Sequence, residues 1–382
     1  MKILPFKTSA EISIGVELEL QIINPHTFGL MSRAKDLIRI VNESAMKARI
    51  KPEITQSMIE INSSIHDTPG SMLDELHQIQ SYLLEQAEKL EISFCGGGTH
   101  PFHKWSLQKI FPSVRYKKLS RQYRYLSKRS TVFGQHIHVG CKSGDDAIYL
   151  THALARYVPQ LICMAASSPF YLGVDTGYYS SRANVFNAFP LSGVIPYLNN
   201  YEEFSDYFYK MKKCGIIESM KDFYWDVRPK PEFGTVEIRV CDTPLTIKQA
   251  VIIAAYIQSL SLYLLHERPI TISRDLYYVY AYNKFQASRY GVDGQFVAYE
   301  TMQHELIFND IMNTIKNIER YANQLNNMAL ISNLVDQVIN KKSDSTKLRQ
   351  ILKNVNSFPK VVEEQCLIWR KESEDFLSLQ SR

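Results

Sequence analysis

The sequence predicts an α+β protein whose central, antiparallel-rich β-sheet carries polar side chains on one face and helices on the other. Two observations support this fold class. Segments in which apolar and polar residues alternate recur along the chain, as expected for strands with one buried face. Longer segments between them carry apolar residues at helical spacing, which predicts helices that pack against the sheet.

These patterns predict the individual elements in chain order. Alternation predicts strands at residues 11–23, 51–65, 92–95, 131–141 and 227–240, the last being a strand or a hairpin opened by prolines. Helical spacing predicts helices at residues 32–48, 71–90, 145–167 and 247–266.

The last part of the chain has a different, helical character. Residues 299–339 and 347–369 read as helices separated by a polar break at 341–346. Because no Pro/Gly/Ser-rich linker precedes them, we expect a catalytic domain at residues 1–298 and a helical region at 299–382 packed on it. The apolar stripe of this region favours packing on the core or assembly into a homo-oligomer.

The charge balance argues against a nucleic-acid-binding protein. The 382 residues include 44 Lys and Arg against 39 Asp and Glu, a formal net charge of +5. Nucleic-acid-binding proteins usually concentrate a basic excess in one patch. The strongest basic run, residues 115–129, is either a solvated helix face or a phosphate-binding segment.

Cysteine usage and hydropathy predict a cytoplasmic protein without a membrane partner. The six cysteines form no CxxC pair, so neither a zinc ribbon nor a thioredoxin-type site is indicated. The first residues are too weakly apolar for a signal peptide, and no segment offers 18 uncharged apolar residues. We therefore expect a reducing compartment.

Three predicted strands carry pairs of polar residues two positions apart. Such pairs point to the same sheet face, and they are Glu17 with Glu19, His136 with His138, and Glu237 with Arg239. A fourth segment carries Glu53 and Glu60, whose seven-residue separation would place them on opposite faces of one ideal strand. A bulge or bend is then needed to bring both inward.

If these strands adjoin, five carboxylates and two imidazoles share one face. Clustered carboxylates repel one another unless they are protonated or neutralised by cations. Oxygen-rich sites with an occasional imidazole suit Mg²⁺ or Mn²⁺, and two or three ions would complement this set. A metal-binding sheet of this kind suggests ATP, although the chain has no GxxxxGK[ST] loop.

Several motifs together resemble the glutamate–cysteine ligase type 2 family, also called the carboxylate–amine ligases, within the glutamine synthetase/glutamate–cysteine ligase superfamily. The matching runs, in family order, are GVELE at 15–19, EITQSMIEIN at 53–62, GTHPF at 98–102, GQHIHVG at 134–140, SSPF at 167–170 with DTGYYSSR at 175–182, WDVRP at 225–229 with FGTVEIRVCDTP at 233–244, and SRYGVDG at 288–294. The resemblance implies a glutamine synthetase-like catalytic core over roughly residues 10–295.

The resemblance also implies a role for each matching residue. Glu17, His136 and Glu237 match ligands of the metal that bridges the ATP phosphates, and Glu19, Glu53 and Glu60 match ligands of the metal on the acceptor-carboxylate side. Three residues match catalytic positions: His138 near the phosphates, and Arg228 and Arg239 as arginines that neutralise the transferred γ-phosphate or the substrate carboxylate. Arg182 matches a contact to the amino-acid substrate, Arg289 one to the nucleotide, and Asn283 one to the substrate or nucleotide.

The implied reaction joins a small-molecule acid to a small-molecule amine at the expense of ATP. The acid, expected to be glutamate, would form an acyl phosphate, and an amine such as cysteine would then displace phosphate. Two alternatives stay open: a ligase of the superfamily with a different acid or amine, and a non-catalytic homologue that binds ATP or an amino acid. Tyr282 and Glu232 depart from the family pattern and bear on substrate choice. The general base for the amine is not identified.

Overall fold

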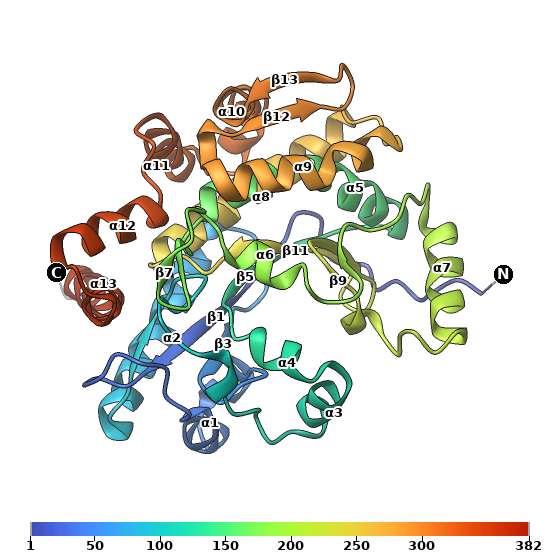
Figure 1. The fold of residues 1–382 in the computed structure, drawn as a ribbon. Coiled ribbons are helices and arrows are strands. Elements are labelled where there is room, and N and C mark those ends of the chain that lie inside the picture. The colour runs from blue at the N-terminus through green and yellow to red at the C-terminus, as the bar shows by residue number, and fades with distance from the viewer. Residues whose placement is uncertain (1, 381–382) are drawn as a thin grey trace.

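The computed structural model describes residues 2–380 and confirms the α+β fold (Figure 1). Its main sheet has seven antiparallel strands in the order β10-β11-β5-β1-β3-β2, with β4 also pairing with β1. The strands are β1 (Ile14–Ile23), β2 (Ile50–Pro52), β3 (Met58–Asn62), β4 (Ser93–Cys95), β5 (Gly134–Gly140), β10 (Val227–Lys230) and β11 (Thr235–Asp242).

Helices α2 (Pro69–Leu90), α5 (Gly144–Ala165) and α8 (Ile247–Glu267) pack on one face of this sheet. Val16, Leu18 and Ile137 on the strands share one core with these helices, and each is at most 2% exposed. Burying an aliphatic side chain of this size contributes roughly 1.5–3 kcal/mol, so the alternation in the strands is what fixes the orientation of the sheet. The opposite face is left to the polar residues.

Helix α8 is apolar on all sides. It is long and apolar enough to cross a membrane by composition, but 89% of its most apolar window is buried inside this fold. Its start is capped by Thr246, whose side chain accepts a hydrogen bond from the backbone N–H of Gln249 at 3.2 Å. A helix buried on every side in a large core has this composition.

The predicted strand at 51–65 is in fact the hairpin of β2 and β3. Glu60 lies on β3 and pairs in register with Glu19 and Lys51. Glu53 follows directly after β2, in the connection between the two strands, so no bulge is needed to bring it to the site. The register irregularity occurs instead on β11, between Ile238 and Cys241.

The C-terminal region departs from the prediction at three points. It begins with a β-hairpin of β12 (Gln295–Ala298) and β13 (Gln303–Leu306), so the expected boundary after residue 298 falls between two paired strands. The expected helix at 299–339 is two helices, α10 (Ile307–Gln324) and α11 (Met328–Ile339). The expected helix at 347–369 is also two, α12 (Asp344–Val355) and α13 (Phe358–Gln380), because Asn356 ends α12 in the left-handed conformation.

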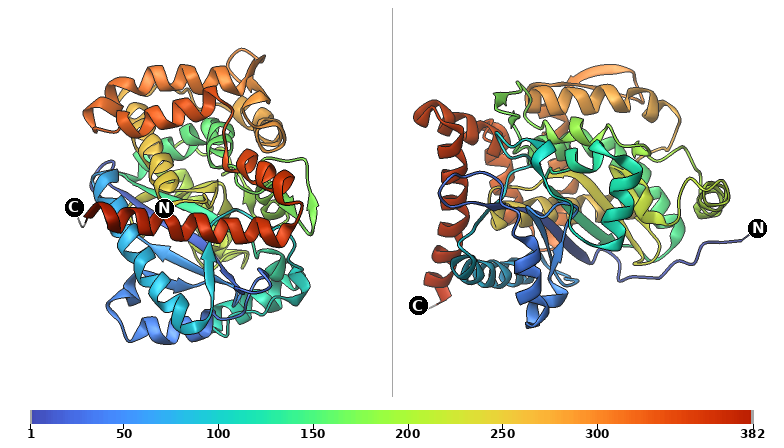
Figure 2. Two further views of the ribbon diagram at one scale, coloured as in Figure 1. Left: turned by 90° about the vertical axis from the view of Figure 1, so that its left-hand side faces the viewer. Right: turned by 60° about the horizontal axis from the view of Figure 1, so that its bottom comes forward.

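Helix α13 runs across one side of the molecule, in contact with α2 and β4 (Figure 2). Gln365 Nε2 donates to the carbonyl of Gly96 at 2.9 Å, and Gln80 Nε2 donates to the carbonyl of Trp369 at 2.9 Å. The Glu372 carboxylate accepts the first backbone N–H groups of α8. The C-terminal helix therefore stabilises both the sheet edge and the core helix.

The helix predicted at 32–48 is α1 (Ala34–Asn42), followed by the short turn η1 (Ala45–Ala48). The remaining elements were not predicted from the sequence, and several lie over the polar sheet face. They are η2 (Trp105–Leu107), α3 (Val114–Tyr123), α4 (Tyr125–Arg129), β6 (Phe170–Tyr171), β7 (Val174–Asp175), α6 (Arg182–Phe186), β8 (Ser192–Gly193), α7 (Tyr201–Lys213), η3 (Met220–Asp222), β9 (Tyr224–Trp225), α9 (Asp275–Tyr290) and η4 (Gly291–Asp293).

Candidate active site

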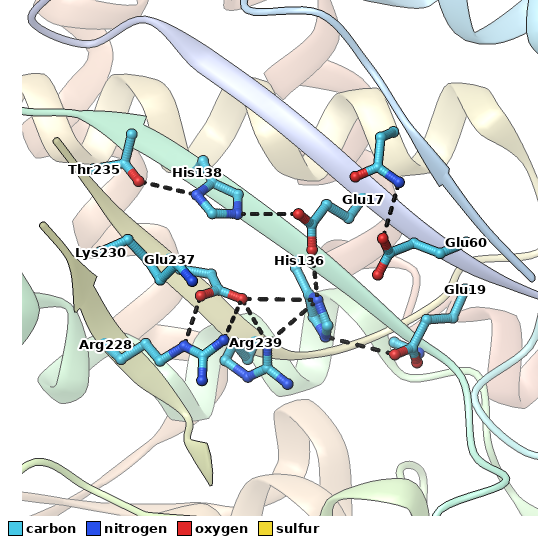
Figure 3. Close-up of polar contacts among 12 residues, drawn as sticks. Glu17, Glu19, Glu60, His136, His138, Arg228, Lys230, Thr235, Glu237 and Arg239 are labelled. Carbon is cyan, nitrogen blue, oxygen red and sulfur yellow. Dashed lines mark hydrogen bonds and ion pairs between the residues drawn. The ribbon is translucent and has the colours of Figure 1, made fainter. Parts of the chain in front are cut away.

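The polar sheet face opens into a cleft of about 460 Å³. Nine of the predicted site residues line it, namely Glu17, Glu19, Glu53, Glu60, His136, His138, Arg228, Glu237 and Arg239. They meet because the strands pair in register: Glu17 lies opposite His136, and Glu237 lies opposite both His138 and Arg228. Figure 3 shows the resulting network of side chains, which come from β1, β3, β5, β10 and β11.

Glu17 sits between the two imidazoles. Its Oε2 lies 3.1 Å from His136 Nδ1, and its Oε1 lies 3.5 Å from His138 Nε2. Burial alone would raise the pKa of Glu17, but the hydrogen bonds from the two histidines outweigh it and hold the pKa well below its usual range. Burial lowers the pKa of His136 to about 4, so this imidazole is neutral near pH 7 and can act as a ligand.

Glu237 is held by two arginines. Arg228 Nε donates to Glu237 Oε2 at 2.6 Å, and Arg239 Nη1 donates to Glu237 Oε1 at 2.5 Å. Burial opposes the ionised form, but the two guanidinium groups prevail and the pKa of Glu237 is lowered. Arg228 is 5% exposed and also donates to the carbonyls of Met220 and Phe223, which orients it toward the cleft.

Glu19, Glu53 and Glu60 have raised pKa values, in contrast to Glu17 and Glu237. Burial raises the pKa of all three, and repulsion from neighbouring carboxylates, Glu17 included, adds to it; the pKa of Glu53 rises to about 7. Glu19 is fixed by its Oε2, which accepts from the backbone N–H of Gly134 at 2.5 Å. A divalent cation would offset the repulsion within this group.

Three sets of ligand atoms lie close enough to hold a cation. Within each set the atoms lie within 4.8 Å of one another, and the sets are Glu17–His138–Glu237, Glu17–Glu60–His136 and Glu19–Glu53–Glu60. His136 Nε2 is buried and has no hydrogen-bond partner among residues 2–380. Carboxylates with one imidazole are the donor set that Mg²⁺ or Mn²⁺ accepts, so the residues fit the expected ions.

The geometry groups the histidines differently from the sequence-based expectation. His136, expected beside Glu237, has its Nδ1 3.9 Å from Glu237 Oε1 but is grouped with Glu17 and Glu60. His138, expected near the phosphates, is grouped with Glu17 and Glu237. Its Nδ1 lies 2.9 Å from Thr235 Oγ1, a contact that orients Nε2 toward Glu17.

Arg182, expected as a substrate contact, does not line this cleft. It is 3% exposed and lies against Gly134, where a Cβ atom would stand 1.9 Å from Arg182 Nη2. Its Nη1 donates to the carbonyls of Arg239 and Val240 at 3.3 and 3.5 Å. The structure thus places Arg182 behind β11, the strand that carries Arg239, and the hydrogen bonds of Arg182 support that strand.

Asn283 and Arg289, expected at the substrate or the nucleotide, also lie outside the cleft. Asn283 makes two hydrogen bonds to the backbone of Val297 on β12, at 2.9 and 2.8 Å. Arg289 donates to the carbonyl of Gly177 and packs on the ring of Tyr290 at 4.9 Å. Both side chains are occupied in holding α9 to neighbouring segments.

The cleft also has basic residues that were not assigned from the sequence. They are Lys51, Arg115, Lys221 and Lys230. Lys230 stands two positions after Arg228 on β10, the same spacing that identified the other pairs, and it is 4% exposed. Its Nζ lies 2.8 Å from Glu232, the acidic residue noted as a departure from the family pattern. Arg115 belongs to the basic run at 115–129, whose phosphate-binding interpretation its position favours.

Comparisons with known proteins agree with these motifs. The model of the glutamate–cysteine ligase family 2 matches residues 13–364. A Legionella pneumophila (strain Corby) protein, provisionally named glutamate–cysteine ligase 2-1, is 59% identical over 375 residues, which cover 98% of each chain. A Herminiimonas arsenicoxydans protein, provisionally named glutamate–cysteine ligase 2, is 46% identical over 96% of this chain and 99% of its own.

Solved structures show the same fold at low sequence identity. A glutamate–cysteine ligase from Francisella tularensis, solved in complex with AMP, has a TM-score of 0.73 at 14% identity and covers 98% of this chain and 90% of its own. A bifunctional glutathione synthetase from Pasteurella multocida has a TM-score of 0.67 at 13% identity, over 95% of this chain and 52% of its own.

Proposed function

The chain belongs to glutamate–cysteine ligase family 2, a family of ATP-dependent carboxylate–amine ligases, and we propose that it joins the γ-carboxylate of glutamate to an amine through an acyl phosphate. The observation that carries the proposal is the pairing, on one sheet face, of metal-competent carboxylates and imidazoles with two arginines that share Glu237. Cysteine is the amine that the names of the relatives suggest.

The proposed reaction has two steps. A carboxylate oxygen of glutamate attacks the γ-phosphorus of ATP, and the bond to ADP breaks. The amine nitrogen then attacks the acyl carbon, phosphate leaves, and the amine loses one proton. Phosphoryl transfer depends mainly on positioning and on neutralising charge, so the protein needs few covalent roles.

The acidic and the basic residues of the cleft have different roles in this reaction. The glutamates and histidines would hold Mg²⁺ or Mn²⁺, and the bound ions would neutralise charge at the phosphates and at the acceptor carboxylate. Arg228 and Arg239, each tied to Glu237, present guanidinium N–H groups to the transferred phosphoryl oxygens. Lys230, on the same strand as Arg228, adds a cation at the phosphate end of the cleft. The cytoplasmic location and self-association stay predictions.

ADP release tests the proposal. Purified protein is supplied with ATP, Mg²⁺, glutamate and a panel of amines, and ADP is measured with a coupled assay. Glu17→Gln and Arg239→Ala should each lower kcat at least about 100-fold, since each removes charge stabilisation at the phosphates. Two variants outside the cleft are the matched controls and should keep wild-type activity: Glu85→Gln, at the exposed ion pair with Lys89, and Arg33→Ala, at the half-buried ion pair with Asp36.

Two outcomes would count against the proposal. If no amine supports ADP release, the ligase activity is refuted in favour of a binding homologue. If Glu17→Gln keeps full activity, the assignment of Glu17 as a metal ligand is wrong even though the reaction survives.

A further inference from the structure

Four aromatic rings form one side of the cleft, and we call them the aromatic wall. Tyr123 at the end of α3, Phe186 at the end of α6, Phe189 just beyond it, and Tyr224 on β9 all line the cleft. The ring centroid of Phe189 lies 5.5 Å from that of Tyr123, 5.5 Å from that of Phe186 and 5.3 Å from that of Tyr224. Such offset and edge contacts make a continuous apolar surface rather than four isolated rings.

The aromatic wall lies at one end of the cleft. Tyr224 precedes β10 and Lys230 ends it, so an extended chain separates them by up to roughly 20 Å. At the Tyr224 end, a small cavity of about 10 Å³ is lined by Phe186, Tyr224 and Arg239 among others. At the other end, Lys230 is paired with Thr235, which holds His138.

The two ends differ in the groups that line them. Lys230, Arg228 and His138 lie at the end that suits a triphosphate, because they supply cations and hydrogen-bond donors, and Phe233 is a single ring beside Lys230 and His138. The Arg182 guanidinium lies 5.6 Å from the ring centroid of Phe186, but it is buried and donates to the carbonyls of Arg239 and Val240. The four rings themselves are uncharged and suit an apolar or aromatic group. Glutamate is polar at both ends of its short chain, so it gains little from four rings.

Given the proposed ligase function, on which this inference rests, we propose that the aromatic wall binds the amine substrate and that this amine carries a bulky apolar or aromatic group. The amine would lie against Phe186, Phe189 and Tyr224 with its nitrogen directed to the acyl carbon near Arg239. A small polar amine would contact only part of this surface and would bind more weakly.

The test compares amines of different size in the ADP-release assay. At saturating ATP and glutamate, kcat/KM for 2-phenylethylamine should exceed that for ethanolamine at least tenfold, because a phenyl group buries over 100 Å² of apolar surface at roughly 25 cal/mol per Å². Cysteine should fall between them. Phe186→Ala should remove most of the preference by raising KM for 2-phenylethylamine about tenfold, with KM for ATP within twofold of wild type.

Two further variants keep the test decisive. Phe189 is 5% exposed, so Phe189→Leu, which keeps an apolar side chain, is used beside Phe186→Ala to exclude loss of folding. It should lower the preference for 2-phenylethylamine less than Phe186→Ala does. Phe285→Ala, at a ring on α9 that is 39% exposed and absent from the cleft lining, is the matched control and should behave as wild type.

Each contrary result identifies a different error. A rise in KM for ATP in Phe186→Ala would make the wall a site for the adenine base, and a rise in KM for glutamate would assign it to the acid; either overturns the inference. Equal kcat/KM for the two amines also overturns it. If no amine supports ADP release, the proposed function fails, and binding to the aromatic wall is tested separately by saturation-transfer NMR with 2-phenylethylamine. Saturation transfer in wild type that Phe186→Ala abolishes would support binding at the wall. No saturation transfer in wild type would refute it.

Discussion

Two carboxylates of the same cleft should respond in opposite directions when their charge is removed. Glu53 lies among other carboxylates, and burial together with Glu19 raises its pKa to about 7. Glu237 lies between Arg228 and Arg239, which lower its pKa. In metal-free buffer, Glu53→Gln should therefore stabilise the protein, and Glu237→Gln should destabilise it.

The magnitudes follow from these environments. A carboxyl whose pKa rises from 4.5 to about 7 opposes folding by up to about 3 kcal/mol at pH 7, since a tenfold change in an equilibrium constant is worth about 1.4 kcal/mol. Below pH 4.5 the group is protonated in both states, so the gain from Glu53→Gln vanishes there; it grows between pH 4.5 and 7 and is constant above. Glu237→Gln leaves two buried guanidinium groups without an anion, which costs about 3–5 kcal/mol.

Urea unfolding followed by circular dichroism, in EDTA at pH 4.5 and pH 7.5, measures both free energies of unfolding. Saturating Mg²⁺ should then stabilise wild type by about 2.7 kcal/mol at a concentration of 100 Kd, and should stabilise Glu53→Gln less, because a ligand is missing. The electrostatic reasoning is refuted if Glu53→Gln is neutral or destabilising in EDTA at pH 7.5. Gln keeps the size of the side chain, so a packing effect does not imitate the sign.

Three further predictions concern residues outside this pair. Burial lowers the pKa of His152 to about 4, so the folded protein resists protonating this imidazole. The free energy of unfolding should therefore fall by up to about 3 kcal/mol as the pH drops from 6.5 to 4. His152→Gln should flatten that fall, as measured by urea unfolding across this pH range. Gly134→Ala should destabilise by more than about 3 kcal/mol in thermal unfolding, because its Cβ would meet Arg182, and Gly70→Ala in helix α2, whose Cβ would meet no atom within 4 Å, should not destabilise. Lys230→Gln should raise KM for ATP about tenfold with a smaller effect on KM for glutamate, because one cation at the phosphates is lost.

The metal-competent residues were found from the sequence because strand periodicity is local. A side chain two positions along a strand returns to the same face whatever the rest of the fold does, so the pairs of β1, β5 and β11 could be assigned to one face. The same rule applied to β10 would have added Lys230 to Arg228. The periodicity rule predicted a single bulged strand from Glu53 to Glu60, where the structure has a hairpin. Both arrangements give the same alternation of apolar and polar residues.

Three of the expected site residues lie outside the cleft for a common reason. Arg182, Asn283 and Arg289 lie in segments without strand periodicity, on α6 and α9, where the resemblance supplied positions but no direction for the side chain. The structure shows them bonded to backbone groups, a role that depends on which segments pack together. The aromatic wall was invisible for the same reason, since its rings come from three separate segments.

The alternation of residues along the chain was sufficient to predict the fold class, the polar face of the sheet and the chemistry of its carboxylates, because each depends on spacing within one strand. Strand order, the grouping of each histidine with its carboxylates, the opposite pKa shifts of Glu53 and Glu237, and the side of the cleft closed by aromatic rings depend on contacts between segments far apart in the chain. Coulomb interactions and burial act through space, so only the packed structure decides them.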